Sequence, residues 1–112
     1  MAECLFCRIV RREIPAQIVL EDEQAVVFKD VHPQAPTHVL VVPKRHIASL
    51  SASTDADAVL LGYLQRLACR VADEAKLSSF RLVTNNGSGA GQSVDHLHYH
   101  LLAGRPMAWP PG

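Results

Sequence analysis

The sequence has no excess of charge, because its 112 residues include 11 lysines and arginines against 11 aspartates and glutamates. Proteins that bind nucleic-acid polymers use many cationic side chains to neutralise phosphates. We therefore expect no nucleic-acid polymer as a partner, although a few well-placed groups could still hold a small anion. The length is that of one domain, so we expect a single domain over residues 1–112.

Long apolar runs are also lacking, since no stretch reaches the roughly 18 residues that a membrane-spanning helix needs. The opening segment MAECLFCRIVRREIP carries charge throughout and has no apolar centre typical of a signal peptide. The cysteines number 3, an odd count that does not predict a disulfide framework and is typical of reducing compartments. These absences predict a cytoplasmic protein with no membrane partner.

The secondary-structure pattern predicts one long helix among several short strands. Residues 53–76 have apolar side chains at helical spacing after an acidic start, and residues 4–13 predict a short amino-terminal helix. Alternating and continuous apolar runs predict strands over 18–20, 25–28, 38–42, 80–85 and 96–103. The glycine-rich segment 86–93 predicts a loop, and the proline-rich tail 104–112 predicts extended chain. The fold class is therefore α+β, with a mainly antiparallel sheet of about five strands.

The segment DHLHYHLLAG carries three histidines at two-residue spacing, His96, His98 and His100. On a strand these side chains share one face, while the apolar residues between them can pack against the long helix. Burying imidazoles without partners costs a few kcal/mol each, so this face must be solvated or hold something polar.

Two functions compete for this histidine face. Histidine is the commonest metal ligand, but His96 and His100 would lie roughly 13 Å apart on a strand, too far to share one ion without strain. Alternatively, His98 acts as a nucleophile, with its other ring nitrogen held by an acceptor. The loop immediately before, with Gly87, Gly89 and Gly91, could cradle a phosphate with its N–H groups. Loop and histidines together favour attack on phosphorus.

The motif HLHYHLL matches the pattern His-φ-His-φ-His-φ-φ, in which φ is apolar, and the chain resembles the histidine triad (HIT) family. The segments REIPAQIVLED, DVHPQAPTHVLVVPKRHI, AGQSV and GRPMAWPPG are similar to the Hint branch of that family. The resemblance implies a homodimer of HIT-like domains that hydrolyses purine nucleoside 5′-phosphoramidates, such as AMP or GMP linked to an amine. The reaction passes through a covalent nucleotidyl-histidine and needs no cofactor.

The resemblance also assigns the catalytic roles. His98 matches the nucleophile, and His100 would bind the phosphate or move protons. His38, in PTHVLV, resembles the family histidine outside the triad that supports the nucleophile. Ser93, in GQSV, would contact the phosphate or the leaving group.

The nucleotide-binding residues follow from the same resemblance. Asp30 matches the position that accepts hydrogen bonds from the ribose, and Asn85 matches an asparagine near the phosphate and ribose. Phe28 and Val31 would line the base pocket, and Trp109 resembles a tail tryptophan that reaches the partner subunit's site. The full expected set is Phe28, Asp30, Val31, Asn85, Gly91, Gln92, Ser93, His98, His100 and Trp109.

The pair Cys4-x-x-Cys7 is half of a zinc site or a redox motif, and the redox interpretation lacks a βαβ context. Tetrahedral zinc needs four nitrogen or sulfur ligands, and His46 and His96 could supply the other two. Some HIT proteins with this CxxC resemble that arrangement, which would make His96 a structural ligand rather than a catalytic group. Cys69, on the long helix, is expected to be a packing residue.

Other functions stay open on the sequence. A dinucleoside polyphosphate hydrolase would use the same chemistry with a different leaving group. A nucleotide-binding scaffold would hydrolyse only incidentally, and a small zinc domain would not catalyse at all. The sequence does not identify the physiological substrate or leaving group.

Overall fold

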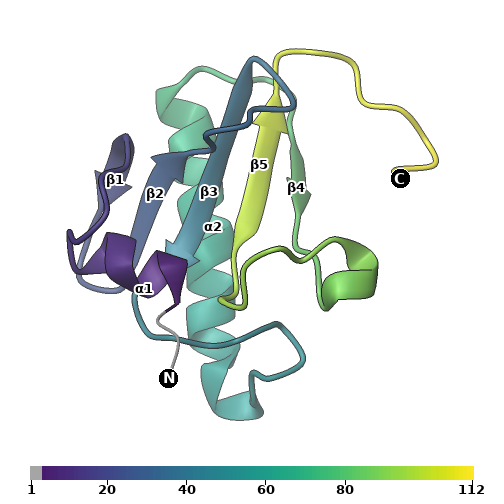
Figure 1. Cartoon of the computed structure of the whole chain (residues 1–112). Coiled ribbons are helices and arrows are strands. Elements are labelled where there is room, and N and C mark those ends of the chain that lie inside the picture. Colours follow the sequence, from purple (N-terminus) through teal and green to yellow (C-terminus); the bar gives the residue numbers. More distant parts are fainter. Residues whose placement is uncertain (1–3) are drawn as a thin grey trace.

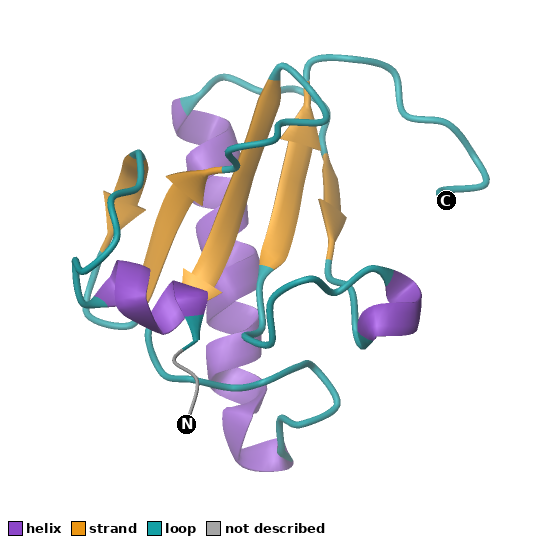
Figure 2. Cartoon of the chain, in the orientation of Figure 1, coloured by secondary structure: helices purple, strands orange, loops and turns teal. Residues whose placement is uncertain are grey.

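The computed structural model describes residues 4–112, which form a five-stranded antiparallel sheet with helices on both faces (Figures 1 and 2). The strand order is β1-β2-β3-β5-β4. The strands are β1 (Ile18–Glu21), β2 (Ala25–Lys29), β3 (Thr37–Pro43), β4 (Arg81–Val83) and β5 (Tyr99–Ala103). The expected α+β class, with a mainly antiparallel sheet, one long helix and a short amino-terminal helix, is confirmed.

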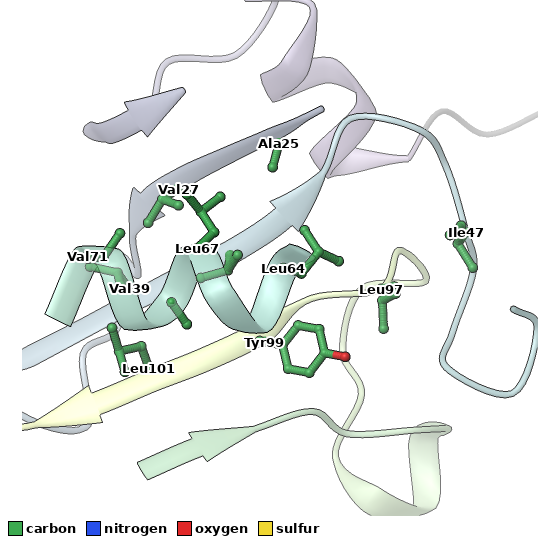
Figure 3. Close-up of a cluster of buried hydrophobic side chains, with 12 residues drawn as sticks. Ala25, Val27, Val39, Ile47, Leu64, Leu67, Val71, Leu97, Tyr99 and Leu101 are labelled. Carbon is green, nitrogen blue, oxygen red and sulfur yellow. The ribbon is translucent and has the colours of Figure 1, made fainter. Parts of the chain in front are cut away.

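The long helix α2 (Ala58–Glu74) covers one face of the sheet, after a short 3-10 turn over Asp55–Asp57. Its side chains Leu64, Leu67 and Val71 pack against strand residues such as Val39 and Leu101 (Figure 3). The turn before it is closed by Asp57, whose carboxylate accepts the Thr54 N–H at 2.8 Å and pairs with Arg45. Helix and sheet together form the main hydrophobic core.

The opposite face of the sheet is covered by the short helix α1 (Leu5–Val10). Phe6 and Ile9 of α1 are buried in a second hydrophobic cluster with Val26, Phe28 and Leu40, among others. Successive residues of β2 and β3 therefore point into different cores and are buried on both sides. This double burial explains why these strands are continuously apolar rather than alternating.

Several observed boundaries are narrower than the sequence pattern predicts. The fold has α1 over six residues rather than 4–13, and Arg12 beyond it takes a positive φ of 63°. The last strand begins at Tyr99 and not at residue 96. The backbone before it bonds elsewhere, because the Leu97 N–H donates to the Ile47 carbonyl at 2.6 Å. Consequently only His100 of the triad lies in a strand.

Three further elements differ slightly from expectation. The strand expected over 80–85 is limited to the three residues of β4, and the glycine-rich loop contains a 3-10 turn over Ser88–Ala90. Helix α2 begins within the expected range 53–76 and ends two residues early, where Lys76 adopts a positive φ of 58°. Across residues 4–112, every helix is too short or too polar to cross a lipid bilayer.

Candidate active site and metal-ligand cluster

The three histidines of the triad occupy three different environments. His96 is fully buried, His98 is 4% exposed, and His100 is partly exposed on β5. The face they were expected to share is therefore neither uniformly wet nor unpartnered. Among the described residues, no buried side-chain nitrogen or oxygen lacks a hydrogen-bond partner.

His96 belongs to a cluster with two thiols and a second imidazole, which we call the Cys–His cluster (Cys4, Cys7, His46 and His96). The His96 Nδ1 atom lies 3.2 Å from Cys4 Sγ, 3.5 Å from Cys7 Sγ and 3.1 Å from His46 Nδ1. Its other ring nitrogen, Nε2, lies 2.8 Å from the Pro43 carbonyl oxygen. Since a carbonyl only accepts, Nε2 carries the proton and Nδ1 presents a lone pair to the cluster.

The Cys–His cluster fits a tetrahedral metal ion. Its four ligand atoms all lie within 4.8 Å of one another, and Cys7 Sγ is 3.3 Å from His46 Nδ1. Zinc with bonds of about 2.0 Å to nitrogen and about 2.3 Å to sulfur separates tetrahedral ligand atoms by about 3.3–3.8 Å. The observed spacings of 3.1–3.5 Å are close to that range. Two thiols and two imidazoles are also a donor set that zinc prefers.

His98 has the complementary protonation pattern. Its Nδ1 lies 2.7 Å from the His96 carbonyl oxygen, so Nδ1–H donates and Nε2 keeps its lone pair. An imidazole in this tautomer can act as a nucleophile without losing a proton first. The same residue, His96, therefore contributes its ring to one site and its backbone carbonyl to the other.

A second group, which we call the Asp–His cluster (Asp30, His38 and His100), lies beside the nucleophile. The Gln34 N–H donates to His38 Nδ1 at 3.0 Å, which leaves the proton of neutral His38 on Nε2. That Nε2–H lies 2.9 Å from His100 Nδ1 and 3.4 Å from Asp30 Oδ2. His100 therefore accepts at Nδ1 and keeps its own proton on Nε2.

Burial keeps the imidazoles of the Asp–His cluster neutral. It lowers the pKa of His100 to about 4, helped by nearby His98 and His38 and opposed by Asp30. Burial also lowers the pKa of His38, with Asp30 again opposing. At neutral pH both rings are therefore uncharged donors whose tautomers are set by their neighbours.

Asp30, His98 and His100 line a cavity of about 450 Å³, whereas His38 is buried behind them and is not part of its lining. The expected residues that line it are Phe28, Asp30, Val31, Ser93, His98 and His100. One wall was not anticipated, because Leu5, Phe6 and Ile9 of α1 line the same cavity. Their helical spacing is visible in the sequence, but only the tertiary structure shows that the helix covers the histidines.

Four expected nucleotide-binding residues lie outside this lining. Gln92 closes the glycine-rich loop: its Oε1 accepts the Gly87 N–H at 2.8 Å and its Nε2 donates to the Ala48 carbonyl at 2.8 Å. Gly91 adopts a φ of 95° beside Asn85, with 3.8 Å between a Cβ placed at Gly91 and the Asn85 Nδ2. Trp109 is 82% exposed on the tail that extends away from the sheet (Figure 1).

Comparison with known proteins gives similarity over nearly the whole chain. The model of the HIT domain matches residues 11–107. An uncharacterized HIT-like protein of Synechocystis sp. (strain ATCC 27184 / PCC 6803 / Kazusa) is 54% identical over 114 aligned residues, covering 100% of each chain. The crystal structure of a HIT family hydrolase from Legionella pneumophila Philadelphia 1 is 49% identical with a TM-score of 0.96, covering 98% of this chain and 100% of that one. A HIT family hydrolase from Clostridium thermocellum is 43% identical with a TM-score of 0.91, covering 96% of both chains.

Proposed function

Since the chain belongs to the HIT domain family, we propose that it hydrolyses purine nucleoside 5′-phosphoramidates through a covalent intermediate on His98. The observation that carries this proposal is the tautomer of His98. Its Nδ1–H is held by the His96 carbonyl at 2.7 Å, and its ring lines the cavity together with Ser93 and His100. A fixed nucleophile next to neutral donors is the arrangement that nucleotidyl transfer requires.

In the first step, the lone pair on His98 Nε2 forms a bond to the α-phosphorus as the bond from phosphorus to the amine breaks. The amine nitrogen takes up one proton from solvent and leaves, and the water of the second step returns that proton. The Nδ1–H bond to the His96 carbonyl stabilises the positive charge that develops on the attacking ring. The products of this step are the free amine and a nucleotidyl-histidine.

In the second step, water attacks the same phosphorus and His98 leaves with its lone pair restored. The water releases one proton to solvent in this attack, which balances the proton that the amine took up in the first step. The Asp–His cluster holds His100 in its donor tautomer. His38 Nε2–H and His100 Nδ1 are 2.9 Å apart, and Asp30 Oδ2 lies 3.4 Å from the same His38 atom. The uncharged Nε2–H of His100 can donate to a phosphoryl oxygen in both steps.

The nucleoside would occupy the apolar part of the cavity. Phe28, Val31 and the α1 residues Phe6 and Ile9 provide apolar walls for a purine ring. The Asp30 carboxylate stands at the boundary between these walls and the histidines, where ribose hydroxyls could donate to it. This division favours a nucleotide over a small phosphate ester without a base.

The test is to trap the intermediate. Wild-type protein, quenched during turnover of an adenosine 5′-phosphoramidate, should carry one AMP group on His98, located by mass spectrometry of peptides. His98→Ala should form no adduct and lose turnover by at least about 10³-fold, because the nucleophile is removed. Equal turnover by both proteins would refute the proposal.

A comparison of two substrates with the wild-type protein distinguishes the two possible leaving groups. A dinucleoside polyphosphate hydrolase would form the same adduct but release a nucleoside polyphosphate instead of an amine. We expect a kcat/KM at least about 10-fold higher for the phosphoramidate than for a diadenosine polyphosphate. The reverse ratio would favour the alternative, and adduct formation with neither would favour a nucleotide-binding scaffold.

We propose that the Cys–His cluster holds a structural zinc ion, with Cys4, Cys7, His46 and His96 as ligands. Support comes from the ligand-atom spacings and from the His96 tautomer, whose Nδ1 lone pair faces the thiols while Nε2–H bonds to Pro43. Zinc there would fix the ends of distant segments and take no part in the steps above. Protein purified without added zinc should contain about one equivalent, and less than a tenth would rule out this site.

We also propose that the protein is a homodimer. β4 is an edge strand of the sheet. Phe80, which precedes it, is 40% exposed, and Trp109 on the tail is 82% exposed. A strand edge with exposed aromatic residues nearby is suited to pairing with a second copy. Analytical ultracentrifugation should give about twice the monomer mass at micromolar concentration, and a monomer would contradict the proposal.

A further inference from the structure

Phe6 of α1 makes ring contacts with the nucleophile and with one expected metal ligand. Its ring lies 5.0 Å from the His98 ring at an interplanar angle of 85°, and 5.9 Å from the His96 ring at 65°. A third contact, to Phe28, has a centroid distance of 5.4 Å and an angle of 77°. Phe6 is only 4% exposed, so these contacts are made within a packed core. None of the catalytic roles described above uses this side chain.

A nucleophilic imidazole needs more than one restraint. The bond from Nδ1–H to the His96 carbonyl sets the tautomer and points Nε2 away from that carbonyl. This single hydrogen bond does not by itself fix the tilt of the ring, which the His100 ring also contacts at 5.0 Å and an interplanar angle of 62°. The perpendicular Phe6 ring at 5.0 Å opposes a change of tilt, because the tilting ring would meet it.

The element that carries Phe6 is anchored by the Cys–His cluster. Helix α1 has only six residues, too few to be stable on its own. Cys4 is its N-cap and accepts the Cys7 N–H at 3.4 Å, and both thiols contact imidazoles. Cys4 Sγ reaches His96 at 3.2 Å and Cys7 Sγ reaches His46 at 3.3 Å. Phe6 lies between these two anchored positions in the sequence.

We propose that Phe6 is a positioning residue for His98, and that the Cys–His cluster, by anchoring α1, keeps the Phe6 ring against the nucleophile. This inference rests on the proposed function for its catalytic consequence. The cluster then reaches the nucleophile twice, through the His96 carbonyl and through Phe6. Loss of the cluster should therefore slow attack on phosphorus even though no cluster side chain contacts substrate.

The first test compares Phe6→Leu with Phe6→Tyr and with Val26→Ala. Val26 is 1% exposed in the same hydrophobic cluster as Phe6 but does not line the cavity, so it controls for loss of packing alone. For Phe6→Leu we expect adduct formation in a single turnover to slow by about 10-fold, with KM changed by less than about 3-fold. Phe6→Tyr, which keeps a ring, should stay within about 3-fold of wild type, and Val26→Ala should match wild type in rate.

A spectroscopic readout separates positioning from general damage. Nuclear magnetic relaxation of the His98 ring should report one rigid orientation in wild type and in Val26→Ala, and added ring motion in Phe6→Leu. Relaxation is the readout because loss of the Phe6 ring current, 5.0 Å away, would shift the His98 resonances even in an unmoved ring. Equal rates and equal His98 ring motion for Phe6→Leu and Val26→Ala would overturn the proposal. So would a rise in KM for Phe6→Leu without a fall in the single-turnover rate, because Phe6 would then serve only as pocket wall.

The second test addresses the anchor. The double variant Cys4→Ser/Cys7→Ser, checked for folding by circular dichroism, should show the same added His98 ring motion and a comparable loss of single-turnover rate. Wild-type ring motion and rate in this folded variant would refute the anchoring role. Should wild type form no adduct with any nucleoside phosphoramidate, the proposed function fails. The His98 ring motion of Phe6→Leu would then still decide whether Phe6 fixes the ring.

Discussion

The Cys–His cluster and the Asp–His cluster both contain two histidines, but His96 and His38 point different ring nitrogens, with different protonation, into their clusters. In the former, His96 bonds to the Pro43 carbonyl through Nε2–H and presents the lone pair of Nδ1 to two thiols. In the latter, His38 receives the Gln34 N–H at Nδ1 and presents Nε2–H to His100. A metal ion requires lone pairs, whereas proton transfer requires a donor facing an acceptor.

The difference shows that residue type and proximity do not by themselves define a metal site. In the Asp–His cluster, as in the Cys–His cluster, the ligand atoms all lie within 4.8 Å of one another. A cation at His38 Nε2 would have to displace a proton that the Gln34 N–H holds in place by occupying the other nitrogen. One backbone group, the Gln34 N–H, therefore leaves a proton on the inward nitrogen of His38, and another, the Pro43 carbonyl, leaves a lone pair on the inward nitrogen of His96.

The largest expected effect is loss of metal from the Cys–His cluster. Cys4→Ser/Cys7→Ser should bind less than a tenth of an equivalent of zinc and unfold about 15 °C below wild type. The reason is that a ligand whose free concentration is about 1,000 times its Kd stabilises the folded state by about 4 kcal/mol. Metal analysis and thermal unfolding measure the two effects.

The matched controls test whether the two clusters differ as described. Cys69→Ser changes a half-buried thiol on α2 outside both clusters and should keep its zinc. Asp30→Asn alters the Asp–His cluster and should also keep one equivalent. Zinc loss in Asp30→Asn comparable to that of the double cysteine variant would erase the distinction between the clusters.

A smaller effect is expected from removing the donor in the Asp–His cluster. His38→Gln can place an amide N–H near the position of Nε2, whereas the shorter His38→Asn cannot. We expect kcat to fall by about 10-fold in His38→Gln and about 100-fold in His38→Asn, since positioned proton donors contribute about 10²–10⁴-fold. Steady-state kinetics with a nucleoside phosphoramidate measures both.

Both His38 variants should retain their zinc, because His38 makes no contact with the thiols in the described structure. An equal loss of kcat in Gln and Asn variants would mean that the Nε2–H donor is not what His38 supplies. A greater loss in His38→Gln would contradict the tautomer derived from the Gln34 contact.

Much of the fold could be predicted from local pattern. The hairpin of β1 and β2 and the helix α2 follow from apolar spacing that their own residues carry. The start of β5 could not be predicted this way. His96 and Leu97 continue the alternating pattern, but the Leu97 N–H bonds to Ile47, a residue distant in sequence. The Ile47 carbonyl lies in another loop, and the residues around Leu97 carry no pattern that predicts this hydrogen bond.

Part of the candidate site could likewise be predicted from the sequence, and part could not. The triad motif and the CxxC pair point to the side chains themselves, and the structure brings Cys4, Cys7, His46 and His96 within 4.8 Å of one another. The tautomers depend on backbone groups, which every residue has and which therefore leave no mark in the sequence. The role of α1 as a wall of the cavity also depends on where a short helix docks.

The smaller of the two expected effects on stability arises in acid, and it isolates the Asp–His cluster. Burial lowers the pKa of His100 to about 4 from an ordinary value of 6.5. Between pH 6.5 and pH 4 the unfolded chain binds a proton at this residue that the folded chain does not, so stability falls as pH falls through that window.

In His100→Asn the side-chain oxygen can still accept from His38 Nε2, but nothing titrates at that position. Wild type should therefore lose about 10 °C more in its unfolding midpoint than His100→Asn between pH 7 and pH 4, by scanning calorimetry. Acidic side chains and released zinc act on both proteins and cancel in the comparison. Parallel curves would mean that His100 is protonated in the folded state well above pH 4, and the neutral donor assigned to it would be lost.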